Sequence, residues 1–431
     1  MYRGFRFAKY LGGCGWNVAV LTTAIDADYG DAGLKIPDQI SIDRTRIISF
    51  LDPTVRFRNV LIGRKTDQEK RAPIRTGIDH RKRKTIREIW RHAKDTMSLI
   101  LTFPDDKIGW FPYGLVRGWK IIKRKNIDVI YTSGPPHSVH LIGLALQRLT
   151  SKPWIADFRD PWARKPWLKE EEKRNWRQHG IEKLERWVVE RATHLILNTE
   201  SMVSDFVRVY ERQGREKFSW IPNGYDQEDF LGLYSRRNGG PFRITHTGTL
   251  YKKRNPLILL EAVRTLIDSG LFSEKDIEIE FIGKIILDHV SIEEKSRELG
   301  LRDAVRLIPQ LPHRECMMRL YDSDVLLVVQ PETDTQIPGK IFEYLFVGKP
   351  ILALAHEGAT RDFVQKNKLG YVANPDQLRE VSDALRSLYE NHRDGRNPDG
   401  SRDSLLQFYE ARNLTRMFGE LMTRCLSSPL D

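Results

Sequence analysis

The stretch that decides the fold is QIPGKIFEYLFVGKPI, which covers residues 336–351. Pro338 and Gly339 end a loop, and the apolar run after them predicts a helix over residues 341–347. A Gly-Lys-Pro turn follows, and the next apolar run predicts a buried strand over residues 351–355. A helix, a tight turn and a buried strand in this order are typical of an α/β fold with a parallel sheet.

The same alternation extends over almost the whole chain in both directions. Strands are predicted at 17–22, 128–131, 154–156, 194–197 and 218–221, and again at 243–247, 277–282, 305–308, 325–329, 351–355 and 370–372. Helical patterns lie between them, for example at 136–149, 170–191, 201–209 and 256–268. Buried parallel strands with right-handed crossovers form doubly wound sheets. We therefore predict two Rossmann-like domains, residues 1–228 and 229–405, joined by the turn-rich segment around 221–241.

Features that suit a phosphate gather at the start of the helix predicted over 341–347. In two doubly wound domains the ligand site lies in the cleft between them, beyond the carboxyl ends of the strands. The first amides of the helix have no partner within it, and Gly339 allows a diphosphate to approach them closely. Lys340 adds a positive charge, and Glu343 can accept two hydrogen bonds from ribose hydroxyls. The alternative is a capped helix with a solvated Glu343.

A second anion-binding candidate follows the strand predicted over 243–247. Gly248 and Thr249 belong to a Thr-Gly-Thr turn that can offer amides and hydroxyls to a phosphate. Three cationic residues come next, Lys252, Lys253 and Arg254. Together with the Pro-Gly-Lys helix start they predict a two-sided diphosphate clamp. The alternative is a solvated basic loop.

Polar residues also follow two strands of the first domain. Ser133 and His137 come after the strand at 128–131 and can hydrogen-bond sugar hydroxyls or phosphate. Two carboxylates and a guanidinium follow the strand at 154–156, namely Asp157, Arg159 and Asp160. Such residues are cleft candidates because polar loops follow the ends of parallel strands. The alternative for Asp157, Arg159 and Asp160 is an internal Arg–Asp ion pair that holds the loop. His140 and His246 are predicted to be packed core residues.

Positive charge is concentrated in the first part of the chain. The 431 residues carry a formal net charge of +12. Residues 1–228 contain 42 Lys and Arg against 28 Asp and Glu, whereas the remainder contains 28 against 30. The segment 52–95 has 14 basic and 6 acidic residues, and we predict a basic insertion over about 26–102. Such a surface attracts anionic lipids, lipid-linked phosphates or nucleic acid, unless it is a solvated loop without a partner.

Composition and motifs exclude several classes of protein. With 40% hydrophobic and 30% charged residues the chain is neither disordered nor fibrous. No apolar run approaches the ~20 residues of a membrane span, and no signal-peptide pattern opens the sequence. Cys14, Cys316 and Cys425 are too few and too scattered for a disulfide framework or a metal cluster, and they fit the cytoplasm. P-loop, C-x-x-C, G-x-S-x-G and nucleic-acid-binding motifs are absent, so we expect neither a metal site nor a nucleic-acid partner.

Five segments of the chain carry a family resemblance. They are IYTSGPPHSVH at 130–140, WIADFRDPW at 154–162, IPNGYD at 221–226, TGTLY at 247–251 and IPGKIFEYL at 337–345. Together they resemble the family 4 glycosyltransferases, and more narrowly the branch that builds bacterial surface polysaccharides. The resemblance implies a GT-B fold, in which two Rossmann-like domains face a cleft and a carboxyl-terminal helix, here 406–431, crosses back to the first. It also implies a nucleotide-sugar donor, transfer with retention of configuration, and no required metal.

The resemblance assigns roles to individual residues. The catalytic candidates are His137, Asp160, Lys253 and Arg254. The donor-binding candidates are Gly248, Thr249, Lys253, Arg254, Pro338, Gly339, Lys340 and Glu343. Within this set Glu343 is expected to hold the ribose. Lys340, together with Lys253 or Arg254, is expected to neutralise the diphosphate. His137 and Asp160 are expected to border the donor sugar and the acceptor.

Two features depart from the family pattern. Family members often carry an acid eight residues before the ribose-binding Glu, but that position here is Thr335. Family members also open with a strand and a Gly-rich loop, whereas this chain opens with a helical pattern over residues 2–11. The expectation from this second difference is a misplaced start or a truncated protein.

The sequence thus predicts a metal-independent, retaining hexosyltransferase of surface polysaccharide synthesis. Its donor is a UDP- or GDP-type nucleotide sugar, with no further cofactor, and its acceptor is a glycan or a lipid-diphosphate-linked glycan. The expected location is the cytoplasm, with peripheral contact to the anionic inner membrane face. The alternatives are a sugar-nucleotide epimerase of the same fold and a truncated, inactive partner protein. A basic nucleic-acid binder is the last alternative.

Overall fold

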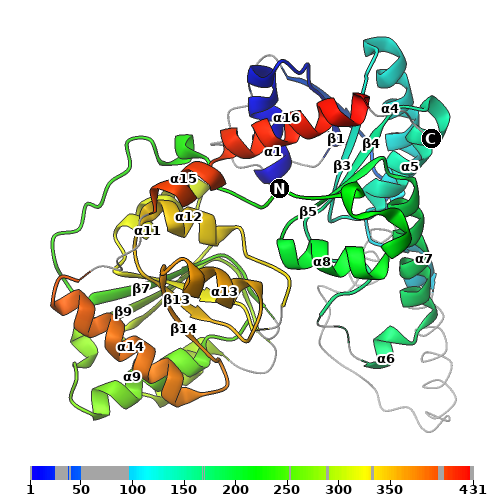
Figure 1. Cartoon of the computed structure of the whole chain (residues 1–431). Coiled ribbons are helices and arrows are strands. Elements are labelled where there is room, and N and C mark those ends of the chain that lie inside the picture. The colour runs from blue at the N-terminus through cyan, green and yellow to red at the C-terminus, as the bar shows by residue number, and fades with distance from the viewer. Residues whose placement is uncertain are drawn as a thin grey trace, which may run out of the picture.

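The chain folds into two α/β halves, each built on its own parallel sheet (Figure 1). The computed structural model describes residues 2–24, 37, 40–49, 97–166, 168, 170–251, 254–287, 291–331, 334–396 and 402–427. Most of the basic insertion predicted over about 26–102 lies outside these described residues. Lys252 and Lys253 of the predicted clamp also lie outside them.

The first half contains a four-stranded parallel sheet in the order β3-β4-β5-β6, and a separate parallel pair of β1 and β2. Its strands are β1 (Ala19–Thr23), β2 (Ser41–Thr45), β3 (Ile130–Gly134), β4 (Trp154–Phe158), β5 (His194–Leu197) and β6 (Phe218–Trp220). Its helices are α1 (Tyr2–Leu11), α4 (Phe111–Lys125), α5 (Ser138–Thr150), α6 (Glu170–Lys173), α7 (Trp176–Arg191) and α8 (Glu200–Val209). All residues of β4 are buried, because alternate side chains enter two different hydrophobic clusters on the two faces of the sheet.

The second half contains a six-stranded parallel sheet in the order β11-β9-β7-β12-β13-β14, and a short pair of β8 and β10. Its strands are β7 (Phe242–Thr247), β8 (Leu250–Tyr251), β9 (Ile277–Ile282), β10 (Ile285–Ile286), β11 (Val305–Ile308), β12 (Val325–Val329), β13 (Ile351–Leu354) and β14 (Gly370–Ala373). Its helices are α9 (Leu257–Asp268), α10 (Ile292–Glu298), α11 (His313–Tyr321), α12 (Lys340–Val347), α13 (Ala359–Lys366), α14 (Leu378–Arg393), α15 (Asp403–Tyr409) and α16 (Ala411–Ser427). Because side chains of β12 alternate between two clusters, helices cover both faces of this sheet as well.

All the predicted strands are present, and β5, β9, β11 and β12 have the predicted bounds. The strands β2, β8 and β10 were not predicted, and β2 lies within the segment predicted as an insertion. The single helix predicted over 170–191 is wrong, because the chain breaks between α6 and α7. At the break the Asn175 side chain accepts a hydrogen bond from the Gln178 amide and thereby caps α7. No bounds were predicted for the helices α4, α10, α11, α13 and α14.

Two crossing segments, one around Tyr225 and one at Tyr409 to Ala411, run side by side between the halves. The Tyr225 amide donates to the Tyr409 carbonyl (3.1 Å), and the Ala411 amide donates to the Tyr225 carbonyl (2.8 Å). A Cβ atom at Gly224 would lie 2.2 Å from the Tyr409 oxygen, so this close approach requires glycine.

Helix α16 then packs with α1 over the sheet of the first half (Figure 1). The ring centroids of Phe7 in α1 and Phe418 in α16 are 4.8 Å apart. Both rings belong to one buried cluster with Ile155 of β4 and Ile196 of β5. The carboxyl-terminal helix is therefore anchored on the first half, although it follows the second half in sequence.

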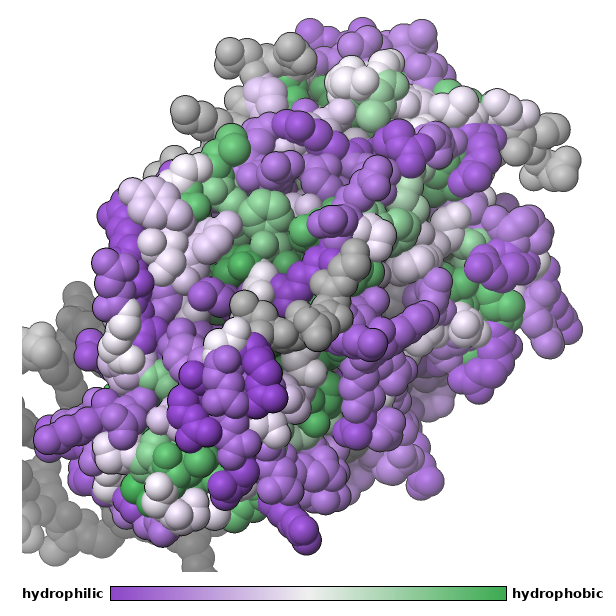
Figure 2. Space-filling model, turned by 60° about the vertical axis from the view of Figure 1, so that its left-hand side comes forward, coloured by the Kyte–Doolittle hydropathy of each residue, from purple (hydrophilic) through white to green (hydrophobic). Residues whose placement is uncertain are grey.

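None of the described helices is both long and apolar enough to span a membrane. The face in Figure 2 is largely hydrophilic, with small separate apolar patches.

Candidate active site

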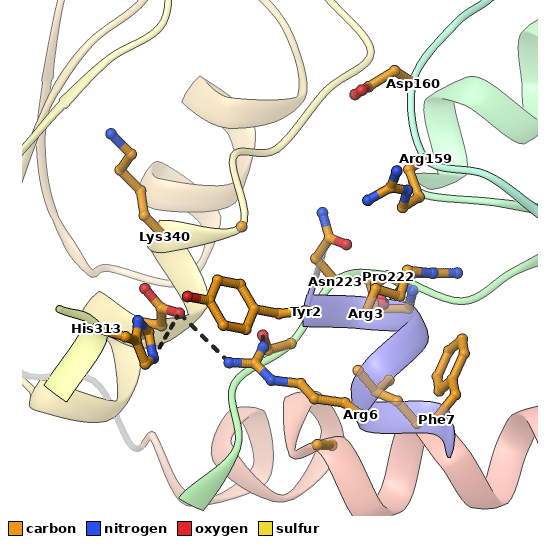
Figure 3. A pocket seen from close by; sticks show the side chains of 15 residues that line it. Tyr2, Arg3, Arg6, Phe7, Arg159, Asp160, Pro222, Asn223, His313 and Lys340 are labelled. Atoms are coloured by element: carbon orange, nitrogen blue, oxygen red, sulfur yellow. Dashed lines mark hydrogen bonds and ion pairs between the residues drawn. The ribbon is translucent and has the colours of Figure 1, made fainter. Parts of the chain in front are cut away.

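A pocket of about 340 Å³ lies between the two halves (Figure 3). This volume lies in the range of small-molecule sites. Arg159 and Asp160 line it from the loop after β4, and Pro222 to Gly224 from the crossing segment. His313 of α11 and the start of α12 line it from the second half, and α1 closes it at one end. The cleft predicted between two α/β units therefore exists and is lined by polar groups from both.

Lys340, the first residue of α12, is held by the end of β7. Its amine donates to the Thr247 carbonyl and lies 3.2 Å from His246 Nε2. His246 Nδ1 faces the Leu327 carbonyl at 3.0 Å, so Nδ1 carries the proton and Nε2 is free to accept from the lysine. His246 is buried, as predicted, but it also positions Lys340, a role that sequence reasoning missed.

This amine is easy to deprotonate. Burial and the charge of Arg254 lower the pKa of Lys340 to about 7, and the charge of Glu343 opposes the effect. The pKa of His246 is well below its usual value because the ring is buried beside Lys340. A bound anion would restore the charge of the lysine, because an adjacent negative charge favours the ammonium form.

The turn after β7 lies beside the same amine. Gly248 has φ +111°, and a Cβ there would lie 3.0 Å from Lys340 Nζ, so a side chain at this position would crowd the lysine. Gly248 and Thr249 are exposed. The charge of Arg254 lowers the pKa of both Lys340 and Asp160, and its guanidinium carbon lies 4.7 Å from the centroid of the Tyr251 ring.

Asp160 connects the loop after β4 with the loop before α12. Its Oδ1 accepts a hydrogen bond from Gln336 Nε2 (2.6 Å), and nearby the Thr199 hydroxyl donates to the Thr335 carbonyl. Burial raises the pKa of Asp160, while Arg159 and Arg254 oppose the rise. These bonds join the halves at the edge of the pocket.

The ion pair considered within residues 157–160 does not form. Arg159 instead donates to the carbonyls of Gly134 and Pro135. Asp157 is fully buried and pairs with Arg3 of α1 through two hydrogen bonds of 3.0 Å. The Tyr131 and Ser133 hydroxyls also donate to it, so these three residues anchor α1 rather than face the pocket.

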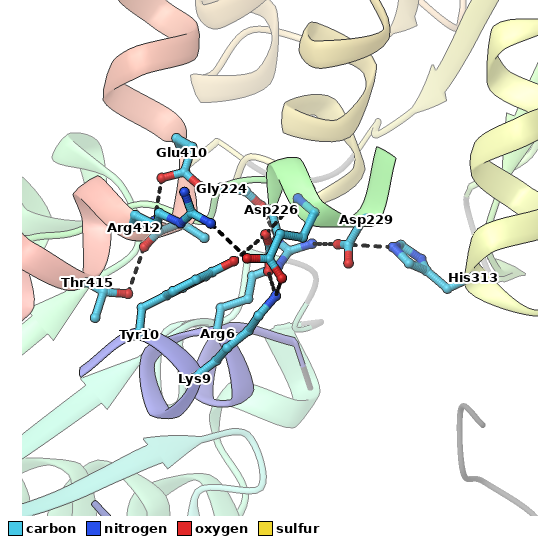
Figure 4. Close-up of polar contacts among 12 residues, drawn as sticks. Arg6, Lys9, Tyr10, Gly224, Asp226, Asp229, His313, Glu410, Arg412 and Thr415 are labelled. Carbon is cyan, nitrogen blue, oxygen red and sulfur yellow. Dashed lines mark hydrogen bonds and ion pairs between the residues drawn. The ribbon is translucent and has the colours of Figure 1, made fainter. Parts of the chain in front are cut away.

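Glu343 lies one turn into α12 and faces α1. Its Oε1 is 3.5 Å from Arg6 Nη2 and 3.9 Å from His313 Nε2. Arg6 also donates to the Gly224 carbonyl and to Asp229 (3.0 Å), as Figure 4 shows. Arg3, Arg6 and Lys9 lie three residues apart in α1, and all three bind the crossing segment around Tyr225. Arg6 also contacts Glu343. The three-residue spacing was the signal in the sequence that α1 has a basic face.

The remaining predicted residues have different surroundings. His137 is buried and stacks on Trp162, with ring centroids 5.1 Å apart, and it is not among the residues that line the pocket. Burial and the neighbouring His140 hold the pKa of His137 well below its usual value, so the ring is neutral. Pro338 accepts a hydrogen bond from the Ile341 amide in the first turn of α12. Lys253 lies outside the described residues.

The structure therefore brings Asp160, Gly339, Lys340 and Glu343 together in one pocket, with Gly248 beside the Lys340 amine. The predicted residues that do not line the pocket are His137, Gly248, Thr249, Arg254 and Pro338. Among the described residues, no group of three or more His, Cys, Asp or Glu is arranged to hold a metal ion. Sequence reasoning missed Tyr2, Arg6 and His313, which line the pocket from α1 and α11.

Two family models match the chain. The model described as Glycosyltransferase Family 4 matches residues 78–229, and the model described as Glycosyl transferases group 1 matches residues 235–399. The two matches are adjacent and together cover most of the sequence. No curated protein sequence matches the chain significantly.

Several solved structures share the fold at low sequence identity. Sucrose-phosphate synthase from Thermosynechococcus elongatus has a TM-score of 0.63 at 13% identity, over 98% of this chain and 92% of its own. Anabaena HepE in complex with UDP-glucose has a TM-score of 0.57 at 12% identity, over 94% and 99%. WaaG, a glycosyltransferase of lipopolysaccharide biosynthesis, has a TM-score of 0.56 at 14% identity, over 98% and 95%. The similarity covers both halves and their arrangement.

Proposed function

Because this chain belongs to the family 4 glycosyltransferases and has the GT-B fold, we propose that it transfers a hexose from a UDP- or GDP-type nucleotide sugar with retention of configuration. The observation that carries the proposal is the pocket between the halves, where Lys340 and the start of α12 face Arg159 and Asp160. The complex of HepE, a protein of the same fold, with UDP-glucose supports this class of donor.

The diphosphate is proposed to bind at the start of α12. The dipole of α12 and the amides at its very start, before those of Ile341 and Phe342 that donate to the Pro338 and Gly339 carbonyls, favour an anion there, and Lys340 and Arg254 add cationic charge. Glu343 is proposed to accept hydrogen bonds from the ribose, since it lies one turn further along the same helix. The diphosphate and then the ribose would thus lie along α12, from its first residue toward Glu343.

The chemical step is proposed to need no metal, because the protein's own cations act on the leaving group. The bond between the sugar C1 and the phosphate oxygen breaks, and the acceptor oxygen bonds to C1 from the same face. The acceptor proton passes to the departing phosphate. Lys340, Arg254 and the α12 amides stabilise the growing negative charge, which is an electrostatic effect of the oxyanion-hole type. Asp160 is proposed to border the donor sugar and the acceptor, and His137 to support the loop behind them.

The acceptor is proposed to be a glycan on a lipid diphosphate at an anionic membrane surface, in surface polysaccharide synthesis. The 42 basic against 28 acidic residues of the first 228 positions support this. Helix α4 exposes Tyr113, Val116 and Trp119 on successive turns, ends in a basic run, and contains no acidic residue. Aromatic and basic side chains on one helix suit the bilayer interface.

Transfer is tested with the purified full-length chain, UDP- and GDP-sugars and a lipid-linked glycan acceptor, with NMR of the anomeric product. We expect a product with the donor's anomeric configuration, and losses of turnover of about 100-fold for Lys340→Met and Arg254→Ala, as for a lost oxyanion-hole donor. Lys366→Met, an exposed lysine of α13, is the matched control. An inverted product, normal turnover in both variants, or an epimeric nucleotide sugar formed without acceptor would contradict the proposal.

Membrane contact is tested by sedimentation with vesicles of neutral and of anionic lipid at low salt. Binding should require anionic lipid and should weaken in Trp119→Ser. It should persist in Trp187→Ser, which removes an exposed tryptophan from α7. Absence of binding to anionic vesicles would exclude this contact.

A further inference from the structure

Two aromatic rings from opposite sides of the pocket meet at its α1 end. Tyr2 comes from α1 and His313 is the first residue of α11. Their ring centroids are 4.9 Å apart and their planes are inclined by 31°. Both residues line the pocket, and Figure 3 shows the Tyr2 ring reaching from α1 toward His313.

We propose that Tyr2 and His313 form the subsite for the nucleobase of the donor. This inference rests on the proposed function and adds to it the residues that hold the base. Along the pocket wall Lys340 comes first, Glu343 follows one turn later, and His313 lies 3.9 Å beyond its carboxylate. A nucleotide has the same order of diphosphate, ribose and base. A ribose on Glu343 therefore directs its base toward the two rings.

The charges around the rings favour stacking with a base. His313 Nε2 lies 3.4 Å from Asp229 and close to Glu343, and these carboxylates raise the pKa of His313. The guanidinium carbon of Arg6 lies 5.7 Å from the centroid of the Tyr2 ring. The phenol ring thus has the His313 ring and the Arg6 guanidinium as neighbours, and aromatic and cationic planes of this kind stack on nucleobases.

The two rings belong to different halves of the molecule. Helix α1 is anchored on the first half by the Arg3–Asp157 pair and by its packing with α16, whereas α11 belongs to the second half. A base stacked against the edge of this ring pair would contact both halves. The subsite therefore links recognition of the base to the approach of α1 and α11.

The test compares ligands with and without a base. Calorimetric titrations of the full-length chain use UDP, GDP and inorganic pyrophosphate. We expect Tyr2→Ala and His313→Ala to weaken the tighter-binding nucleotide about 5- to 100-fold, the range for loss of one stacking partner. Pyrophosphate, which has no base, should bind as it does to the unaltered protein. Tyr2→Phe keeps the ring and should keep the affinity.

The control is Tyr234→Ala, which removes an exposed tyrosine that does not line this pocket. Thermal melting of each variant identifies any that fail to fold, and Tyr2→Phe then carries the comparison. Equal losses for nucleotide and pyrophosphate, or unchanged nucleotide binding in both alanine variants, would overturn the subsite while leaving the diphosphate clamp intact. If the unaltered chain binds none of the three ligands, the proposed function fails and the subsite with it.

Discussion

Binding of a nucleoside diphosphate should be accompanied by uptake of a proton at Lys340. In the free protein burial lowers the pKa of this amine to about 7, so at pH 8.5 most of it is neutral. A diphosphate beside the amine favours the ammonium form and raises the pKa again. The expected uptake is about one proton per nucleotide at pH 8.5 and about half a proton at pH 7. Affinity should therefore fall about tenfold, or about 1.4 kcal/mol, for each pH unit above 7.

Isothermal titration calorimetry measures this uptake directly. The binding heat at one pH is compared in two buffers with different ionisation enthalpies, and the difference gives the number of protons bound. Lys340→Arg is the matched variant, because a guanidinium stays charged over this range and should abolish the uptake. An unaltered protein that binds nucleotide at pH 8.5 without taking up a proton would refute the reasoning. Equal uptake in Lys340→Arg would refute it as well.

Three further changes test the packing around the pocket. Arg3→Met should lower the free energy of unfolding by about 3–5 kcal/mol in urea, because it leaves Asp157 buried without its cation, and a loss below about 1 kcal/mol would argue against this. Gly224→Ala should lower the melting temperature by several degrees, since its Cβ would lie 2.2 Å from a backbone carbonyl of the second crossing segment, and an unchanged melting curve would speak against that close approach. Gly248→Ala should weaken pyrophosphate binding about tenfold, because the added Cβ crowds the Lys340 amine. The control is Gly270→Ala, at a glycine that also has a positive φ but no neighbour within 4 Å, and it should bind pyrophosphate normally. Equal binding by the two variants would contradict the prediction.

The sheets were predictable because their strands are short apolar runs bounded by turn residues. β12, with the sequence VLLVV, follows this pattern, whereas β9, with IEIEFI, alternates isoleucine with glutamate before its apolar end; both strands have the predicted bounds. The helix α14 carries apolar residues at a helical spacing, namely Val381, Ala384, Leu385 and Leu388, so the same periodicity argument could have found it. The start of α12 was predictable because Pro-Gly-Lys before an apolar run is typical of the first turn of a helix.

The parts of the site that escaped prediction depend on contacts between distant positions. Arg3 and Asp157 are separated by 154 residues, and neither local propensity nor spacing indicates that they pair. Without that pair, the sequence cannot indicate that Tyr2 and Arg6 line the pocket. His137 illustrates the converse: its motif suggested a cleft residue, but the ring packs against Trp162 behind the loop.

The most direct test of the central claim is a crystal structure of the chain with bound UDP or GDP. We expect the diphosphate within hydrogen-bonding distance of Lys340 Nζ and of the first α12 amides, with the ribose at Glu343. A nucleotide bound outside the pocket between the halves, or bound there with its diphosphate away from α12, would contradict the claim.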